Sequence, residues 1–96
     1  MLHSKIQIGN LYCFPKINVQ LMDFDNPFYD IYSKKTRALH KGTPFVPLEV
    51  IVLSDYDHII TSAHCPFYRI KVLLTDGTIW YISINDENVE ITLKTI

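Results

Sequence analysis

The feature that most restricts the fold of this chain is a pair of apolar segments around the turn signal Thr75-Asp76-Gly77. A two-residue loop would set Leu74 opposite Ile79 and scatter the large apolar side chains over both faces of the hairpin. A three-residue loop, with Gly77 in the left-handed conformation, gathers large apolar side chains on one face. They are Tyr68, Ile70, Val72, Trp80, Ile82 and Ile84. The sequence therefore predicts this register, with Trp80 on the buried face and Arg69 and Tyr81 on a partly wet one.

Further strands are expected at residues 5–14, 43–53 and 89–94, from their alternating or β-branched apolar residues. Gly9 marks a turn or bulge within the first of them. Pro47 has no backbone N–H, so we expect the first half of the second to lie on a sheet edge. The last follows a tight turn at residues 85–88.

Residues 15–42 keep neither a helical nor a strand period for long. They are therefore expected to form a long ordered loop with short extended pieces and a turn at residues 23–27, where Asx residues and a proline gather. A short helical turn over residues 33–39, with Ser33 as its N-cap, is the remaining local feature.

Composition indicates one globular domain over residues 1–96, because 48% of the residues are apolar and 20% are charged. About five strands and a long early loop favour an all-β, small, partly open barrel over a sandwich. The net charge of −1 provides no broad field for nucleic acid or an anionic membrane. We find neither a secretory h-region nor an apolar run long enough to span a bilayer. A cytoplasmic protein with cysteines as thiols is expected.

The segment Val72-Leu73-Leu74-Thr75-Asp76-Gly77-Thr78-Ile79-Trp80-Tyr81-Ile82 resembles the distal hairpin of SH3-like barrels. The layout is also similar: residues 5–12 resemble the opening strand, 15–42 the RT loop, 43–53 the second strand and 85–88 the short 3₁₀ turn. Small SH3-like proteins of this kind are common in tailed bacteriophage genomes. The Trp pair of proline-binding SH3 domains is missing, so the resemblance does not imply a PxxP ligand.

The leading functional hypothesis is a non-enzymatic module that binds a host or virion protein, or a second copy of itself. Aromatic residues near charges are typical of protein interfaces. The candidate partner-binding residues are Phe28, Tyr29, Tyr32, Phe67 and Tyr81. The alternative for the loop aromatics, Phe24 included, is that the loop folds over the barrel and buries them as a second small core.

A nucleic-acid-binding barrel is the second hypothesis, because one segment concentrates basic residues beside tyrosines, which can grip phosphates and stack on bases. Its candidate residues are Lys34, Lys35, Arg37 and Lys41. The competing interpretation is a solvated loop.

Metal and catalytic sites are not expected, and neither is a cofactor. The weighed zinc ligands lack the paired spacing of structural sites. They are Cys13, His40, His58, His64 and Cys65. His64 beside Cys65 has no orienting third group. The carboxylates Asp23, Asp25 and Asp30 are more typical of a solvated acidic loop than of a glycosidase pair.

Overall fold

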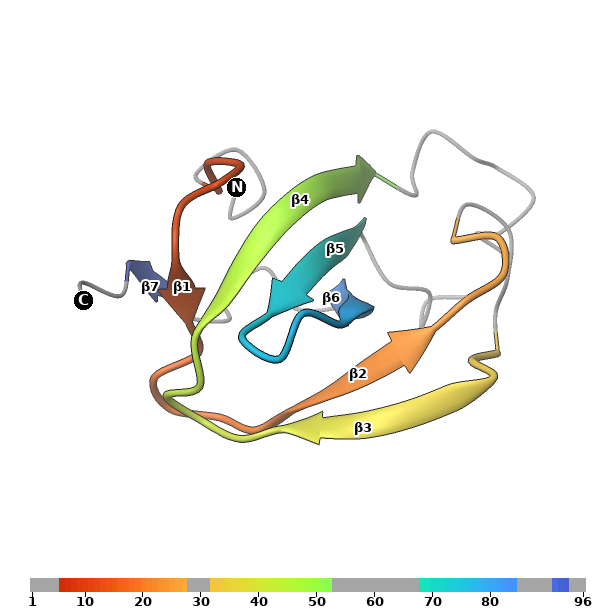
Figure 1. Ribbon diagram of the computed structural model, residues 1–96, viewed down its shortest axis with the longest axis horizontal. Helices are drawn as coiled ribbons and strands as arrows, with labels where there is room; N and C mark the ends of the chain where they lie inside the picture. The colour runs from red at the N-terminus through yellow and green to blue at the C-terminus, as the bar shows by residue number, and fades with distance from the viewer. Residues whose placement is uncertain (1–5, 28–31, 53–67, 85–90, 94–96) are drawn as a thin grey trace.

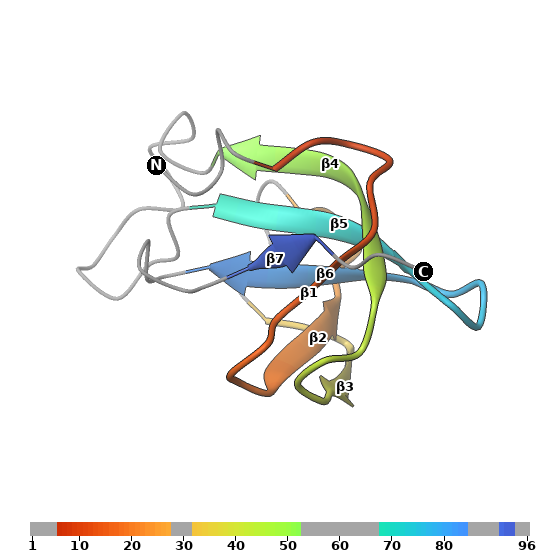
Figure 2. The ribbon, with the colours of Figure 1, turned by 90° about the vertical axis from the view of Figure 1, so that its left-hand side faces the viewer.

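The computed structural model describes residues 6–27, 32–52, 68–84 and 91–93. Within them, seven strands form one antiparallel sheet in the order β3-β2-β6-β5-β4-β1-β7. The strands are β1 (Tyr12–Cys13), β2 (Val19–Asp23), β3 (Lys35–Leu39), β4 (Phe45–Val52), β5 (Tyr68–Leu74), β6 (Ile79–Ile84) and β7 (Thr92–Leu93). The sheet curls into a half-barrel (Figures 1 and 2). The all-β, barrel-like expectation is confirmed, whereas the expected number of about five strands is too low.

The β5–β6 hairpin has the predicted three-residue register. Val72 pairs with Trp80, and the ladder continues to Tyr68 opposite Ile84. Gly77 has a φ of 86°, which is the left-handed conformation that a G1 bulge requires. Its backbone N–H donates to the Leu74 carbonyl at 3.0 Å. Figure 2 shows the turn projecting beyond the rest of the sheet.

The core lies on the inner face of the half-barrel. The inward side chains of β5 and β6 are buried, except that Trp80 is half-buried and packs against the rim of the cluster. Phe14 and Phe45 stack with ring centroids 5.3 Å apart. Leu21 from β2 and Leu39 from β3 complete this core, so the hairpin and the early part of the chain share one apolar interior.

The expectation of a long loop with short extended pieces over residues 15–42 is wrong for residues 19–23 and 35–39, which are paired strands. β2 and β3 form an antiparallel hairpin, with register from Val19 opposite Leu39 to Asp23 opposite Lys35. β2 shows a short alternation that directs Leu21 to the core, but β3 contributes only Leu39 to it. Because a strand with one buried apolar residue has no sequence period, pairing with β2 is what makes it a strand.

The predicted helical turn over residues 33–39 is also wrong. Most of these residues lie in β3. The Ser33 hydroxyl, expected to cap a helix, instead accepts a hydrogen bond from the Asp23 backbone N–H at 2.7 Å. It thereby closes the hairpin rather than starting a helix.

The first strand turns at Gly9 as predicted, where φ is 89°. The ladder proper begins only at Tyr12, which pairs with β4 and with β7. The edge expected for the first half of β4 is wrong, because β4 lies between β5 and β1. Pro47 is accommodated at a register shift opposite Val72, where a missing N–H costs little. The turn expected at residues 85–88 lies outside the described residues.

Candidate binding surface on the β2–β3 hairpin

The β2–β3 hairpin is fastened at both ends. Beside its turn, Ser33 bonds to Asp23, and the Lys34 N–H donates to the Asp23 carbonyl at 2.9 Å. At its open end, the Lys41 N–H donates to Asn18 Oδ1 at 2.8 Å. These bonds hold β3 in an extended conformation although most of its side chains lie outside the core.

Strand β3 is one edge of the sheet. Only β2 lies beside it among the described residues, and both ribbon views show β3 at the border of the molecule (Figures 1 and 2). Lys35, Thr36, Arg37 and Ala38 are all exposed, and Leu39 is the one inward anchor of the strand. An edge strand presents unpaired N–H and C=O groups along its outer side. The hairpin therefore presents a preformed backbone template about 17 Å long.

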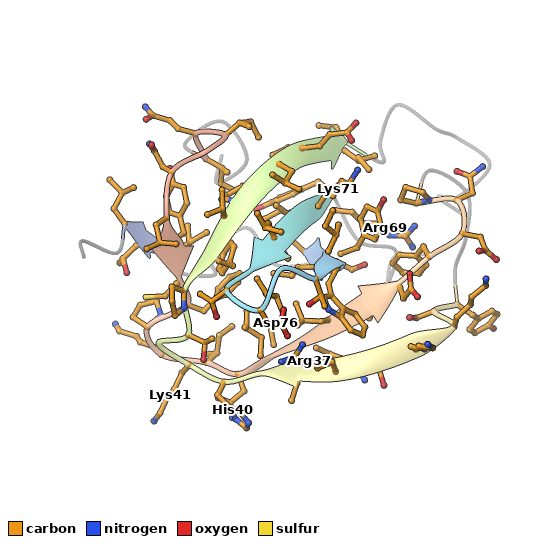
Figure 3. All side chains as sticks on the ribbon, in the orientation of Figure 1. Arg37, His40, Lys41, Arg69, Lys71 and Asp76 are labelled. Carbon is orange, nitrogen blue, oxygen red and sulfur yellow. The ribbon has the colours of Figure 1, made fainter. Side chains whose placement is uncertain are left out.

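Two of the four candidate nucleic-acid residues are paired with carboxylates. Lys34 Nζ lies 2.6 Å from Asp25 Oδ1. Arg37 Nη1 lies 2.6 Å from Asp76 Oδ2, so this ion pair joins β3 to the β5–β6 turn (Figure 3). Lys35 stands opposite Asp23 in the ladder. Three of the four candidate cations therefore lie beside or opposite a carboxylate, and one of these carboxylates, Asp76, is distant in sequence.

Lys41 is the fourth candidate, and it points away from the sheet beyond the end of β3, beside His40 (Figure 3). Arg37 instead lies on the face of β3 that also carries Leu39 and points toward Asp76. Lys41 and Arg37 therefore point in different directions.

Asp76, the acidic partner of this ion pair, is held in place by hydrogen bonds within its own turn. Its carboxylate accepts hydrogen bonds from the Thr78 hydroxyl at 2.6 Å and the Thr78 backbone N–H at 3.0 Å. The Thr78 hydroxyl, then Arg37 and the Thr78 N–H, hold the pKa of Asp76 well below its usual range. A carboxylate that is ionised at neutral pH therefore faces Arg37. A hollow of about 140 Å³ lies beside this pair, with Leu39 and Leu74 in its wall.

The candidate aromatic residues divide into two groups. Phe28, Tyr29 and Phe67 lie outside the described residues. Tyr32 is 86% exposed at the hairpin turn, as a partner-binding residue needs to be. Tyr81 is half-buried on the outer face, with its ring 6.0 Å from that of Phe24.

Phe24 is 5% exposed, so for this side chain the alternative of a second small core is confirmed. Its ring lies under the Arg69 guanidinium, whose Cζ is 3.9 Å from the ring centroid. Burial, and then the charges of Glu49 and Asp23, raise the pKa of Tyr81. The outer face of the sheet therefore has its own packed cluster, opposite the main core.

Arg69 is the important residue that the sequence interpretation missed. The hairpin register predicts that Arg69 lies on a partly wet face, but only 2% of the residue is exposed. Its Nε donates to Ser83 Oγ at 3.2 Å and its Nη1 to the Pro27 carbonyl at 2.6 Å. Arg69 on β5 therefore connects Pro27, in the segment that follows β2, to strand β6. The alternation pattern gives no sign of this, because the partners lie far away in the chain.

The other weighed chemistries find no assembled site in the part of the chain that the structure describes. No group of three His, Cys, Asp or Glu residues able to hold a metal ion occurs there. Cys13 is a buried free thiol, 3.6 Å from Thr92 Oγ1, and His40 is exposed. His58, His64, Cys65 and Asp30 lie outside the described residues.

No protein-family model, no curated protein and no solved structure matched the chain. The described residues also contain no helix with the length and apolar character needed to cross a bilayer.

Proposed function

We propose that this chain is a non-enzymatic protein-interaction module that binds its partner through the β2–β3 hairpin. The observation that carries the proposal is the edge strand β3, held in shape at both ends while four of its five residues are exposed. A preformed surface loses little conformational entropy on binding. Exposed Tyr32, at the hairpin turn, adds the kind of aromatic anchor that protein interfaces favour.

The strand layout supports the SH3-like part of the proposal. β1 pairs with both β4 and β7, and the tight turn at Gly77 joins the last two strands of the β4–β5–β6 meander. The β2–β3 hairpin lies within residues 15–42, the segment that the resemblance assigns to the RT loop. A phage-encoded protein that binds a host or virion protein is the corresponding biological role. The buried Cys13 thiol supports a cytoplasmic location.

Site-specific photo-crosslinking tests the module. A benzoylphenylalanine is placed at Ala38 on β3, or at Leu93 on β7, which is 61% exposed and serves as the matched control. In an extract of the cells that naturally make the protein, we expect one dominant protein adduct from position 38 and none from position 93. Adducts of equal yield from both positions, or none from either, would contradict the proposal.

Light scattering tests self-association, and salt-dependent retention on immobilised nucleic acid tests the nucleic-acid hypothesis. A strictly monomeric chain at high concentration removes self-association as the function. Retention on nucleic acid at low salt that is lost when Lys35 and Lys41 are changed to Glu would favour the nucleic-acid hypothesis instead, since phosphate contacts depend steeply on salt.

A further inference from the structure

We infer that the outer edge of β3 binds an acidic segment of the partner in an extended conformation, as an added strand of the sheet. This inference rests on the proposed function and names the partner chemistry. In such complexes main-chain hydrogen bonds provide affinity, and sites for alternate side chains provide specificity. The β3 edge has both elements.

The backbone element is the open side of residues 35–39. β3 pairs with β2 along its whole length on one side, so every second N–H and C=O group points to the other side. The Lys41 and Ser33 hydrogen bonds keep the strand extended in the free protein. A partner segment can therefore pair with β3 without refolding it.

Charge defines the partner on one face. The charged residues of β3 are Lys35 and Arg37, and the strand contains no Asp or Glu. Lys35 and Arg37 are two positions apart and so share a face of β3. Side chains of an added strand would lie about 5 Å from them, where opposite charges are stabilising.

Arg37 can serve two carboxylates. Its Nη1 donates to Asp76, and a guanidinium has five N–H donors in a fixed fork. The pair with Asp76 holds the side chain in place, so a partner carboxylate meets an oriented donor group. This favours Asp or Glu at every second position of the partner segment.

The other face of β3 selects differently. Thr36 and Ala38 are small, and with Gln20 they line an open hollow of about 270 Å³. An added strand would direct its intervening side chains to this face. Small or medium side chains such as Thr or Val fit there, so the partner pattern alternates acidic residues with these.

A second copy of this chain is a poor occupant of the same edge. Antiparallel pairing of two β3 strands centred on Thr36 or Arg37 sets Lys35 or Arg37 opposite Arg37. Like charges directly opposite each other are destabilising. The edge therefore discriminates against self-pairing, as basic residues on edge strands commonly do.

Selection from a random library of linear peptides tests the inference with the full chain as bait. We expect enrichment of proline-free peptides with Asp or Glu at alternate positions. Lys35→Gln should weaken the binding of a selected peptide about fivefold, because it removes the attraction without setting a carboxylate opposite Asp23. Lys71→Gln on β5 is the matched control, because Lys71 stands opposite Glu49 as Lys35 stands opposite Asp23, and its affinity should stay within about twofold of the parent.

Amide hydrogen exchange then locates the bound peptide. Every second amide of residues 35–39 should slow on binding, and both variants must first show the parent's unfolding midpoint. Enriched peptides that are neutral or basic, or that protect amides elsewhere, would overturn the β3 inference while leaving a protein-binding module. Failure to enrich any peptide, together with absent crosslinks from position 38, would contradict both proposals.

Discussion

Substitution of Gly77 tests the hairpin register on which the fold interpretation depends. Its φ of 86° is disfavoured for any residue with a Cβ. A Cβ built at this position meets no atom within 4 Å. The cost of a substitution is therefore a backbone cost, free of any steric contribution from packing.

The expected losses form a graded series. Gly77→Ala should lower the free energy of unfolding by about 1 kcal/mol, which is the strain of the left-handed conformation less the gain from a stiffer unfolded chain. Gly77→Val should cost about 2 kcal/mol, because β-branched residues tolerate this conformation least. Gly77→Asn should cost less than about 0.5 kcal/mol, since Asn visits it readily.

Urea unfolding and thermal unfolding, both followed by Trp80 fluorescence, measure the series. For a chain of this length, a loss of 1 kcal/mol lowers Tm by about 4–8 °C, so the three variants are resolvable. Thr75→Ala in the same exposed loop is the control, with an expected change within about 0.5 kcal/mol. Equal small losses for Ala and Val would place Gly77 at negative φ and refute the three-residue loop.

Three further predictions concern side chains outside that loop. Arg69→Met should cost about 2–4 kcal/mol, because it removes a cation–π contact and charged hydrogen bonds that hold residues 24–27; urea unfolding measures it, and a neutral result would contradict the buried position. Trp80→Ala should cost about 2 kcal/mol by the same assay, below the range for a fully buried ring, because Trp80 is half-buried. Asp76→Asn should lower the free energy of unfolding at neutral pH, and this loss should shrink as the pH falls below about 4. The reason is that the lowered folded pKa contributes stability above the ordinary aspartate value near 4, which is lost as the pH falls through the folded value; a difference that persists unchanged at pH 2 would contradict this account.

The β5–β6 hairpin was predictable because its information is local. Its turn residues, its alternation and its register all lie within residues 68–84, and a one-residue slip would exchange the faces. The turn at Gly9 was readable for the same reason. In both cases the turn needs a positive φ, which glycine adopts more readily than any other residue.

The proposed binding surface was less predictable from the sequence, because its strand pairing and ion pairs involve residues that are far apart in the chain. β3 has one inward apolar residue, and only the ladder to β2 makes it a strand. Arg37 pairs with Asp76, which is 39 positions away in the sequence, and Arg69 donates to the carbonyl of Pro27, which is 42 positions away. The same basic residues in an unpaired, solvated loop would give the same local composition, so composition alone does not reveal the strand. The basic residues could therefore be listed from the sequence, whereas their ion pairs and the edge position of β3 could not be predicted from it.

Amide hydrogen exchange along residues 35–39 of the free protein tests the open β3 edge most directly. Groups bonded to β2 should be protected, whereas their neighbours should face solvent. The account predicts alternating rates that differ by about a hundredfold or more, at a pH where the chain is folded and monomeric. Uniform protection over all five residues would show that the edge is already paired, and would contradict its role as a docking strand.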